Sequence, residues 1–457
     1  MLLRRLAAIL LVAAPAGAEQ AFVLSTDFET AYYSRLALTA PYGRDVDLGP
    51  TCADAVVRAH GDRVYVVGRL GCDFVQTIDA ATGTTLGQWS TGNGTNPHDI
   101  EIYTSSQAYV SLYERDFILV VDPRNGSALG QVSLSVFSDA DGLPEADEMV
   151  RVGDRLFVAL ERLDRPGGYV AANPSVLAVI DCVTNQLVDV DPSTAGIQGV
   201  PLAGRNPTGE LLFDPVRQKI VVACVGNYGA QDGGAEYVDP WTLQSDGFFV
   251  SESTLGGDLT AVRLWDDCTG YALVSDASFN TKLVRFDHCN GSSLGACLTT
   301  PGFRLSDVEI HAGGTVLVTD RDLIAPGVRL FSAPGCSEIT SAPLDFGLPP
   351  YDLALARPQT LAAAPVGLPG DALRLLPNRP NPFHPRTTLS FVAPVGSHVV
   401  LDIVDVRGRR LATLWNGVTS AMETRVVWDG RGLPAGQYVA TLRGNGTRRT
   451  QQLVLLR

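Results

Sequence analysis

Short runs of alternating apolar and polar residues, separated by tight-turn sequences, fill most of the chain between residues 20 and 357. The stretch PHDIEIYTSSQAYVSLYERDFILVVDPRNGSALGQVSL, which begins at Pro97, contains four such runs, and turn sequences such as TSSQ and PRNG join them. Alternation with a period of two indicates strands with one buried face, and short Asn- and Gly-containing turns connect antiparallel neighbours. This stretch therefore predicts a four-stranded antiparallel meander.

The four-strand pattern recurs along the chain. Related stretches begin at Ala53, Glu148, Gly209, Leu259 and Ser306. Repeats of 45 to 62 residues with four strands each are typical of the blades of a β-propeller. The matching positions at the start of each first strand are Asp54, Asp99, Glu148, Glu210, Leu259, Asp307 and Asp352.

The last repeat is incomplete, since PYDLALA from Pro350 supplies a first strand and nothing more. The missing strands are at the other end of the chain, where AFVLSTDFETAYYSRLALTAPYGRDVDL from Ala21 reads as second, third and fourth strands. A blade built from both ends explains both fragments and leaves no open sheet edge. We therefore expect an all-β fold in which residues 20–357 form a seven-bladed β-propeller, with the terminal strands closing one blade.

The pattern "aYV…viD…G" within residues 64–83 and 108–126 resembles that of the YncE-like, or YVTN-type, bacterial propellers. The resemblance covers about three quarters of the chain and implies the propeller fold. It does not imply one function, because propellers serve in binding as well as in lyase, lactonase and quinoprotein chemistry.

A second module follows the repeats. Residues 358–376 are rich in Pro, Ala and Gly and read as a linker, and the proline cluster PNRPNPFHP from Pro377 is compatible with neither a helix nor a central strand. Alternating runs then continue to the end of the chain. Residues 377–457 therefore predict an Ig-like β-sandwich.

This segment resembles the FlgD-type Ig-like domain and is similar to the C-terminal sorting domains of type IX secretion cargo. The resemblance implies a sorting or attachment module that interacts with secretion machinery or the envelope surface. The chain ends on Arg457 and carries few lysines, which departs from the usual sorting-domain pattern. The matching residues are Pro380, Asn381, Pro382, Phe383, Pro385, Thr387, Phe391, Leu401, Ile403, Asp405, Arg407, Gly408, Arg409, Leu411, Leu414, Trp428, Asp429, Gly430, Gly436, Tyr438 and the terminal LVLLR.

Residues 1–18 read as a signal peptide, with Arg4 and Arg5 before a short apolar run and small residues at Ala16 and Ala18. The run is too short to span a membrane, and no later segment is apolar enough to do so. We therefore expect an exported protein without a transmembrane segment, extracellular, at the cell surface or in the periplasm.

Eight cysteines in an exported chain of this length predict a few disulfides. Cys52 and Cys72 lie at adjacent ends of neighbouring strands and are expected to pair. Cys268 and Cys289 are further disulfide candidates, in turns on one face of the fifth repeat, but Cys297 is only a hairpin away from Cys289 and the sequence does not decide between these pairings. Cys224 is a candidate for a buried free thiol.

The charge is divided between the two modules. Residues 19–371 contain 45 acidic and 21 basic residues, a net charge of −24, whereas residues 372–457 contain 4 acidic and 12 basic residues, a net charge of +8. The acidic module argues against nucleic-acid binding. The basic module suggests adhesion to anionic lipid or polysaccharide of the envelope, unless its arginines only reflect overall composition.

The stretch SDADGLPEADEM concentrates acidic residues around Gly142. Oxygen ligands beside a glycine turn suit calcium, which makes calcium the one candidate cofactor. In the alternative interpretation, these carboxylates bind turn amides in a solvated loop. The candidate calcium ligands are Asp139, Asp141, Glu145 and Asp147. The acids at the starts of the first strands raise a similar choice between a cation-binding ring and bonds to amides of the neighbouring blade.

Two long loops join second to third strands, ERLDRPGGYVAANPS from Glu161 and GNYGAQDGGAEY from Gly226, and both emerge on one face of the predicted ring. Loops on a rigid scaffold often carry function. The candidate ligand-binding residues are Arg162, Arg165, Tyr169, Tyr228, Asp232, His98 and Asp99. The six histidines show no metalloprotease motif, and no catalytic residue is assigned. We expect a secreted or surface protein that binds a protein, glycan or small molecule. The alternative is an extracellular propeller enzyme of the lactonase or lyase type.

Overall fold

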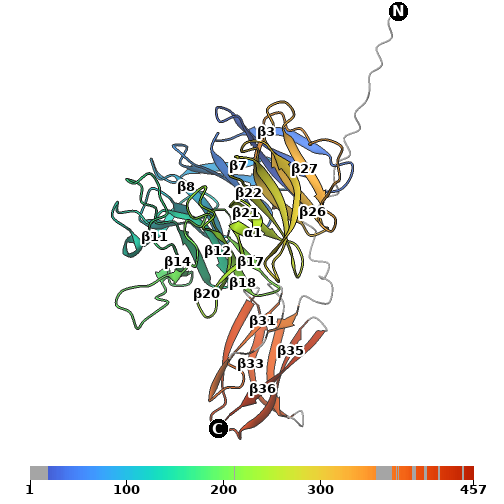
Figure 1. Cartoon of the computed structure of the whole chain (residues 1–457). Coiled ribbons are helices and arrows are strands. Elements are labelled where there is room, and N and C mark those ends of the chain that lie inside the picture. The colour runs from blue at the N-terminus through green and yellow to red at the C-terminus, as the bar shows by residue number, and fades with distance from the viewer. Residues whose placement is uncertain are drawn as a thin grey trace, which may run out of the picture. The chain divides into compact units, whose positions relative to one another are not determined.

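The computed structural model describes residues 19–209, 211–356, 373–376, 378, 380–393, 398–405, 409–419, 423–444 and 447–456. These residues belong to two compact units, one ending at Ala356 and the other beginning at Leu373 (Figure 1). The predicted signal peptide, Glu210 and most of the predicted linker lie outside the described residues.

The described residues of the first unit form seven antiparallel sheets, one for each predicted repeat. The first three sheets in chain order are β4 (Ala55–His60), β5 (Arg63–Gly68), β6 (Phe74–Asp79) and β7 (Thr85–Ser90); β8 (Pro97–Thr104), β9 (Gln107–Leu112), β10 (Phe117–Val121) and β11 (Ala128–Ser133); and β12 (Ala146–Val152), β13 (Arg155–Leu160), β14 (Val176–Asp181) and β15 (Gln186–Leu187), with β16 (Val200–Pro201) also paired to β14.

The next three sheets repeat this order. They are β17 (Leu212–Asp214), β18 (Lys219–Cys224), β19 (Gly234–Asp239) and β20 (Gln244–Ser251); β21 (Asp258–Leu264), β22 (Thr269–Ser275), β23 (Thr281–Asp287) and β24 (Ser292–Thr300); and β25 (Leu305–His311), β26 (Thr315–Asp320), β27 (Gly327–Ser332) and β28 (Ser337–Glu338). Two short helices lie between sheets, a 3₁₀ turn at Ser135–Phe137 and α1 at Glu252–Leu255. No helix in the described part is both long and apolar enough to cross a membrane.

The remaining sheet joins the two ends of the unit. Its order is β29 (Pro350–Ala356), β1 (Gln20–Thr26), β2 (Ala31–Ala37) and β3 (Arg44–Pro50). Phe22 of β1 is the register partner of Ala354 of β29, so residues more than 300 positions apart share one sheet. The terminal strands therefore pair as the incomplete repeats predict.

The sheets contact one another through their first strands. Strand β29 contacts β4, β4 contacts β8, β8 contacts β12, β12 contacts β17, β21 contacts β25, and β25 contacts β29, while β18 contacts β21. Apolar side chains of neighbouring sheets fill the space between them; Tyr109, Met149 and Leu156, for example, lie in one core cluster. This arrangement confirms the predicted all-β propeller fold.

Three disulfides join cysteines of the first unit. The pairs are Cys52–Cys72, Cys268–Cys289 and Cys297–Cys336. The third pair joins β24 to the turn after β27, which links two sheets and settles the question left open by Cys297. Cys182 and Cys224 are free and buried.

The second unit contains two antiparallel sheets. One is β30 (Arg374–Leu375), β31 (Arg386–Val392) and β34 (Glu423–Asp429); the other is β33 (Arg410–Val418), β32 (His398–Asp405), β35 (Gly436–Gly444) and β36 (Thr447–Leu455). Buried side chains from both sheets form one core, which includes Phe391, Leu401 and Trp428. The unit is thus a β-sandwich.

The proline-rich entry to the sandwich is held to its last strand. The Phe383 amide donates to the Val454 carbonyl at 2.9 Å, and the Leu456 amide donates to the Phe383 carbonyl at 2.8 Å. The Asn381 side chain accepts from the Val454 amide at 2.9 Å and donates to the Gln452 carbonyl at 3.1 Å. The side-chain bonds explain the asparagine at position 381, whereas Phe383 is explained by its ring, which is buried against Trp428.

Candidate functional site

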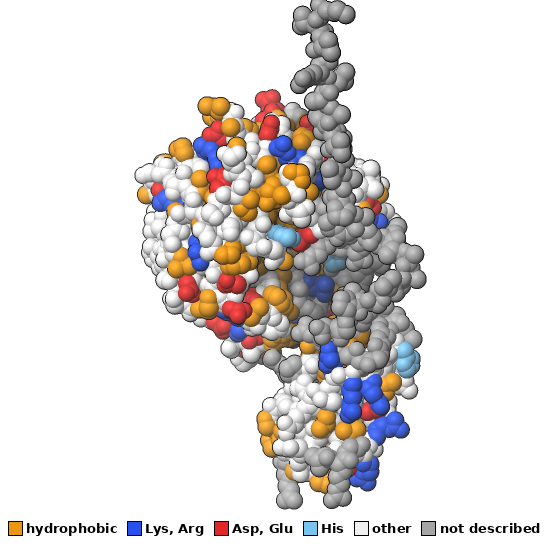
Figure 2. Space-filling model, turned by 90° about the vertical axis from the view of Figure 1, so that its right-hand side faces the viewer, with side chains coloured by type: hydrophobic (Ala, Val, Ile, Leu, Met, Phe, Trp, Pro, Cys, Tyr) orange, Lys and Arg blue, Asp and Glu red, His pale blue; other side chains and the backbone are white. Residues whose placement is uncertain are grey.

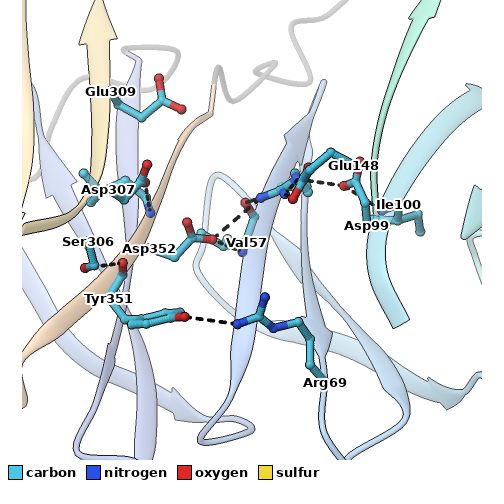
Figure 3. Close-up of polar contacts among 12 residues, drawn as sticks. Val57, Arg69, Asp99, Ile100, Glu148, Ser306, Asp307, Glu309, Tyr351 and Asp352 are labelled. Atoms are coloured by element: carbon cyan, nitrogen blue, oxygen red, sulfur yellow. Dashed lines mark hydrogen bonds and ion pairs between the residues drawn. The ribbon is translucent and has the colours of Figure 1, made fainter. Parts of the chain in front are cut away.

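An arginine near the axis of the ring contacts carboxylates from three other strands. Arg58 on β4 donates from Nε to Asp99 on β8 at 2.8 Å and from Nη2 to Glu148 on β12 at 2.6 Å. Its Nη1 lies 3.7 Å from Asp352 on β29. Figure 3 shows these acids converging from neighbouring sheets. One cation thus links four of the seven sheets.

The acids of the first strands also bind backbone amides of the next sheet. Asp99 accepts from the Met149 amide at 2.8 Å, and Asp307 accepts from the Leu353 amide at 2.8 Å. Asp352 accepts from the Val57 amide at 2.6 Å (Figure 3). Of the two predicted roles for these acids, this geometry favours amide binding between blades. Glu210 lies outside the described residues.

His98 opens β8 and reaches the neighbouring sheet. Its Nδ1 lies 2.6 Å from Oδ1 of Asp147 on β12, and its ring stacks on Tyr113 with the ring centres 4.3 Å apart. The Tyr113 hydroxyl donates to Oε2 of Glu161 at 2.7 Å. We call His98, Tyr113, Asp147 and Glu161 the His98 cluster.

Two acids of the His98 cluster have pKa values shifted in opposite directions. Burial raises the pKa of Glu161 well above its usual range, and the charge of Asp147 raises it further. Burial would also raise the pKa of Asp147, but the hydrogen bond and charge of His98, the hydrogen bond to Glu161 and the charge of Arg69 together lower it. The surroundings thus shift the pKa values of the two carboxyls apart, as in general acid–base sites.

Arg165 and Tyr169 lie beside the His98 cluster. Arg165 donates to both oxygens of Glu114, at 3.0 and 2.6 Å, and its guanidinium lies 5.5 Å from the ring centre of Tyr169 and 6.0 Å from that of Tyr113. Arg162 instead donates to the Pro174 carbonyl at 2.8 Å within its own loop. Arg165 is therefore the predicted loop arginine that reaches the cluster.

The two long loops contact each other. The Ala171 amide of the first loop donates to Oδ1 of Asn227 in the second at 2.9 Å. Asp232 accepts from the Asn227 amide at 2.9 Å and so holds the shape of its own loop. Tyr228 of the second loop is exposed. The loops thus form one surface beside the His98 cluster.

The four predicted calcium ligands do not gather around one point. Asp139 and Asp141 accept amides of their own loop, from Asp141 and Leu143, whereas Asp147 faces His98. The carboxyl of Glu145 is buried, and Arg165 lies 3.9 Å from it. Among the described residues, the one group of three metal-ligand atoms within 4.8 Å of one another is Cys268, Asp287 and Cys289, whose cysteines form a disulfide. Calcium binding stays a prediction, and the geometry favours the amide-binding role.

Exposed apolar side chains gather on one face of the first unit. In an antiparallel meander, the loops from second to third strands all emerge at the same end; we call this end the loop face and the opposite end the turn face. Six of the seven loops on the loop face carry an exposed large apolar side chain, and two of these, Leu323 and Ile324, are 97% and 94% exposed. The exposed residues are Phe28, Leu70, Tyr169, Val170, Tyr228, Phe279, Leu323 and Ile324.

The sequence reasoning missed several partners of the predicted residues. Tyr113 and Glu161 bind each other across two loops, and Arg58 joins acids of three other sheets. The sequence did contain a signal for these partners. The short loop after β9 consists largely of charged or aromatic residues, namely Tyr113, Glu114 and Arg115. Which side chains of different blades meet depends on how the sheets are arranged around the ring, and the sequence alone does not give that arrangement.

These features define a β-propeller with an appended β-sandwich. No family model matches the chain, and no curated protein matches its sequence. Among solved structures, similar chains include PorZ, a surface component of the type IX secretion system of Porphyromonas gingivalis, at 12% identity and a TM-score of 0.44, with 94% of this chain and 64% of that chain covered. This chain therefore spans just under two thirds of the length of PorZ. AztD from Citrobacter koseri is similar at 10% identity and a TM-score of 0.43, over 90% of this chain and 99% of that one. A functionally unknown protein from Desulfotomaculum acetoxidans is similar at 12% identity and a TM-score of 0.49, over 74% and 99%.

Proposed function

We propose that this chain is an exported binding protein whose propeller holds a protein partner on its loop face. The observation that carries the proposal is the set of exposed apolar side chains on six of the seven loops of that face. Large exposed apolar patches mark interaction sites, and aromatic residues are enriched where proteins bind each other. The rigid ring of sheets presents the loops without a folding cost at binding.

The chemistry of the partner follows from the surroundings of these residues. Acids such as Asp27, Glu29 and Asp322 stand beside the apolar tips, in a unit with a large excess of carboxylates. Complementary charge favours association and orients the partner. The fitting partner is a protein surface with apolar side chains and a basic rim.

The test uses a matched pair of variants. Leu323→Ser with Ile324→Ser removes two apolar tips from the loop face, while Val183→Ser with Val216→Ser removes two exposed apolar residues from turns on the turn face. The native chain and both variants are cross-linked to envelope and culture fractions of the source cells. Proteins held by the native chain and the turn-face variant, but lost by the loop-face variant, would support the proposal. Equal capture by all three chains would contradict it.

We further propose that the sandwich is the sorting or attachment module. Arg side chains gather on the side of this unit seen in Figure 2, and the segment carries a net charge of +8 from residue 372 onward. Exposed arginines favour contact with anionic surfaces. The exposed ones are Arg386, Arg409, Arg410, Arg425, Arg431, Arg443 and Arg448.

Cell fractionation tests this module. The native chain is compared with one that ends at residue 372 and with one in which Arg386, Arg425 and Arg448 are changed to Gln. We expect the shortened chain to leave the cell surface for the medium or the periplasm. Release of the arginine variant by a salt wash that leaves the native chain in place would show that charge holds the module. Surface attachment of the shortened chain would contradict the proposal.

The His98 cluster supports a second candidate, an extracellular enzyme of the lactonase or lyase type. A histidine bonded to an ionised carboxylate beside a proton-holding carboxyl can move protons at a bound substrate. Glu161→Gln should then abolish turnover of a panel of lactones and uronate polysaccharides. The activity of the native chain should change with pH as the groups of the His98 cluster gain or lose protons. Absence of turnover by the native chain over this panel would leave binding as the function.

A further inference from the structure

A cavity of about 980 Å³ opens at the turn face, on the side of the ring opposite the His98 cluster. The ends of the first strands line it, because these strands run toward the turn face. Its walls include Arg58, Glu101, Trp265, Asp267 and Glu309. A volume of this size is typical of sites for small organic molecules.

The charged groups on the wall of the cavity are mostly carboxylates. Five carboxylates and two arginines, Arg58 and Arg263, line it. Arg58 is bound by Asp99 and Glu148, which do not line the cavity, and Arg263 lies 3.0 Å from Glu309. Arg151 lies 3.7 Å from Glu101 and Arg217 lies 3.2 Å from Asp214, so the excess of negative charge rests chiefly on Asp266 and Asp267. A cleft with an excess of one charge and apolar walls concentrates the opposite charge inside it. The five lining carboxylates are Glu101, Asp214, Asp266, Asp267 and Glu309.

Aromatic side chains provide a second feature of the wall. Trp265 and Tyr65 both line the cavity. Tyr65 is 5% exposed, and its hydroxyl has no hydrogen-bond partner among the described residues. The hydroxyl oxygen is not among the fully buried atoms, so a ligand in the cavity can bond to it in place of water. Ring faces of Trp and Tyr also attract organic cations.

The arrangement of the acids distinguishes an organic cation from a metal ion. Around the cavity, no three carboxylates of the described residues come within 4.8 Å of one another, so its wall does not offer three carboxylate ligands to one metal ion. Glu101 on β8, Asp267 after β21 and Glu309 on β25 instead come from three different sheets. Carboxylates spread over an aromatic-lined volume suit several ammonium groups joined by carbon chains.

We propose that this cavity binds a small aliphatic di- or polyamine. The ammonium groups pair with the lining carboxylates, the carbon chain packs against Trp265, and one ammonium group donates to the Tyr65 hydroxyl. The cavity opens at the face opposite the loop face. The outcome of one test therefore does not decide the other proposal.

Isothermal titration calorimetry on the full mature chain tests the proposal with three probes of equal carbon length. These are 1,5-diaminopentane, 1,5-pentanediol and glutarate, with spermidine as a longer amine. We expect both amines to bind, the diol and glutarate not to bind, and the amine affinity to fall at least tenfold between 50 and 500 mM salt. Equal binding of the diol, preferential binding of glutarate, or no heat from either amine would overturn the proposal.

Three variants locate the site. Asp267→Lys reverses one exposed charge at the cavity and should weaken amine binding at least tenfold. Tyr65→Phe keeps the packed ring and removes the unpartnered hydroxyl, and should weaken binding three- to tenfold. Glu338→Gln changes an exposed acid on β28 that does not line the cavity, and should leave the affinity unchanged. Native affinity in both cavity variants would overturn the assignment of the site, and circular dichroism of each variant checks that the fold is kept.

Discussion

Nη2 of Arg58 lies 2.6 Å from Oε2 of Glu148, although 90 residues separate the two in the chain. The side chains are 14% and 9% exposed, so this ion pair lies largely out of water. Asp99 and Asp352 approach the same guanidinium from two further sheets. The ion pair joins two blades that share no strand. Charged side chains from several sheets therefore meet near the axis of the ring.

Replacing Arg58 by Met should lower the free energy of unfolding by about 3–5 kcal/mol, because it leaves buried carboxylates without their shared cation. Urea unfolding followed by tryptophan fluorescence measures the change. Arg124→Met removes an exposed arginine that pairs with Asp122 in a turn, and it should leave the unfolding free energy nearly unchanged. An Arg58→Met chain as stable as the native one would show that the cluster does not hold the ring.

Asp307→Asn should lower the free energy of unfolding by about 1–3 kcal/mol. The two carboxylate oxygens accept from the Val308 amide at 2.7 Å and from the Leu353 amide of the next sheet at 2.8 Å. An asparagine offers one acceptor oxygen, so one of these buried amides loses its partner. The control is Asp62→Asn, in a turn where the Asp62 side chain is 48% exposed. Equal midpoints of thermal unfolding for the two variants would refute the prediction.

The buried carboxyl of Glu145 should make the protein less stable as the pH rises. Burial, with the charges of Asp141 and Asp139, raises the pKa of Glu145 to about 8 in the folded chain. Between the ordinary value of 4.5 and about 8, the unfolded chain releases this proton while the folded chain keeps it. The contribution of Glu145 is therefore fully present below pH 4.5 and is lost as the pH rises through 8.

Urea unfolding at several pH values from 5 to 8.5 measures this effect. Glu145→Gln removes the titrating group, so the stability of this variant relative to the native chain should increase with pH over the window. Glu29→Gln, at an exposed position on the same face, should follow the native chain at every pH. A constant difference between Glu145→Gln and the native chain would mean that Glu145 is ionised in the fold.

Loss of the disulfide between sheets should destabilise the ring more than loss of a disulfide within one sheet. Cys297–Cys336 closes a segment of 39 residues, whereas Cys52–Cys72 closes one of 20. In the loop-entropy model each bond contributes about 3–4 kcal/mol, and the longer loop contributes about 0.6 kcal/mol more. Unfolding of the two double-alanine variants measures the order, and a greater loss in Cys52→Ala/Cys72→Ala would reverse the prediction.

The alternation of residues predicted most of the strands, because a strand with one buried face must repeat every second residue. The turns around Gly83 and Gly126, both with a positive φ near 70°, were equally visible as glycines at the same place in two repeats. The closing pair of β1 and β29 followed from counting strands in the two incomplete repeats. The pairing of Cys297 with Cys336 did not follow, because it depends on which sheets are neighbours in the ring.

The candidate site was predicted only in part. His98, Arg165 and Tyr169 were singled out from the sequence and lie together on the loop face. Arg162 and Asp232 were also singled out, but they form hydrogen bonds within their own loops. The loop surface was visible as two long insertions. The partners of His98 were not, because the chemistry of a histidine depends on which neighbour its ring nitrogen reaches.

The sequence by itself determined the strands, the repeats, the closing of the ring by its two ends and the division of charge between two modules, since these depend on local periodicity and composition. Only the tertiary structure decided which acid meets Arg58, which carboxyl holds a proton and where a cavity opens. Burial and distance set these properties, and both arise when side chains far apart in the chain are brought within a few ångströms of one another.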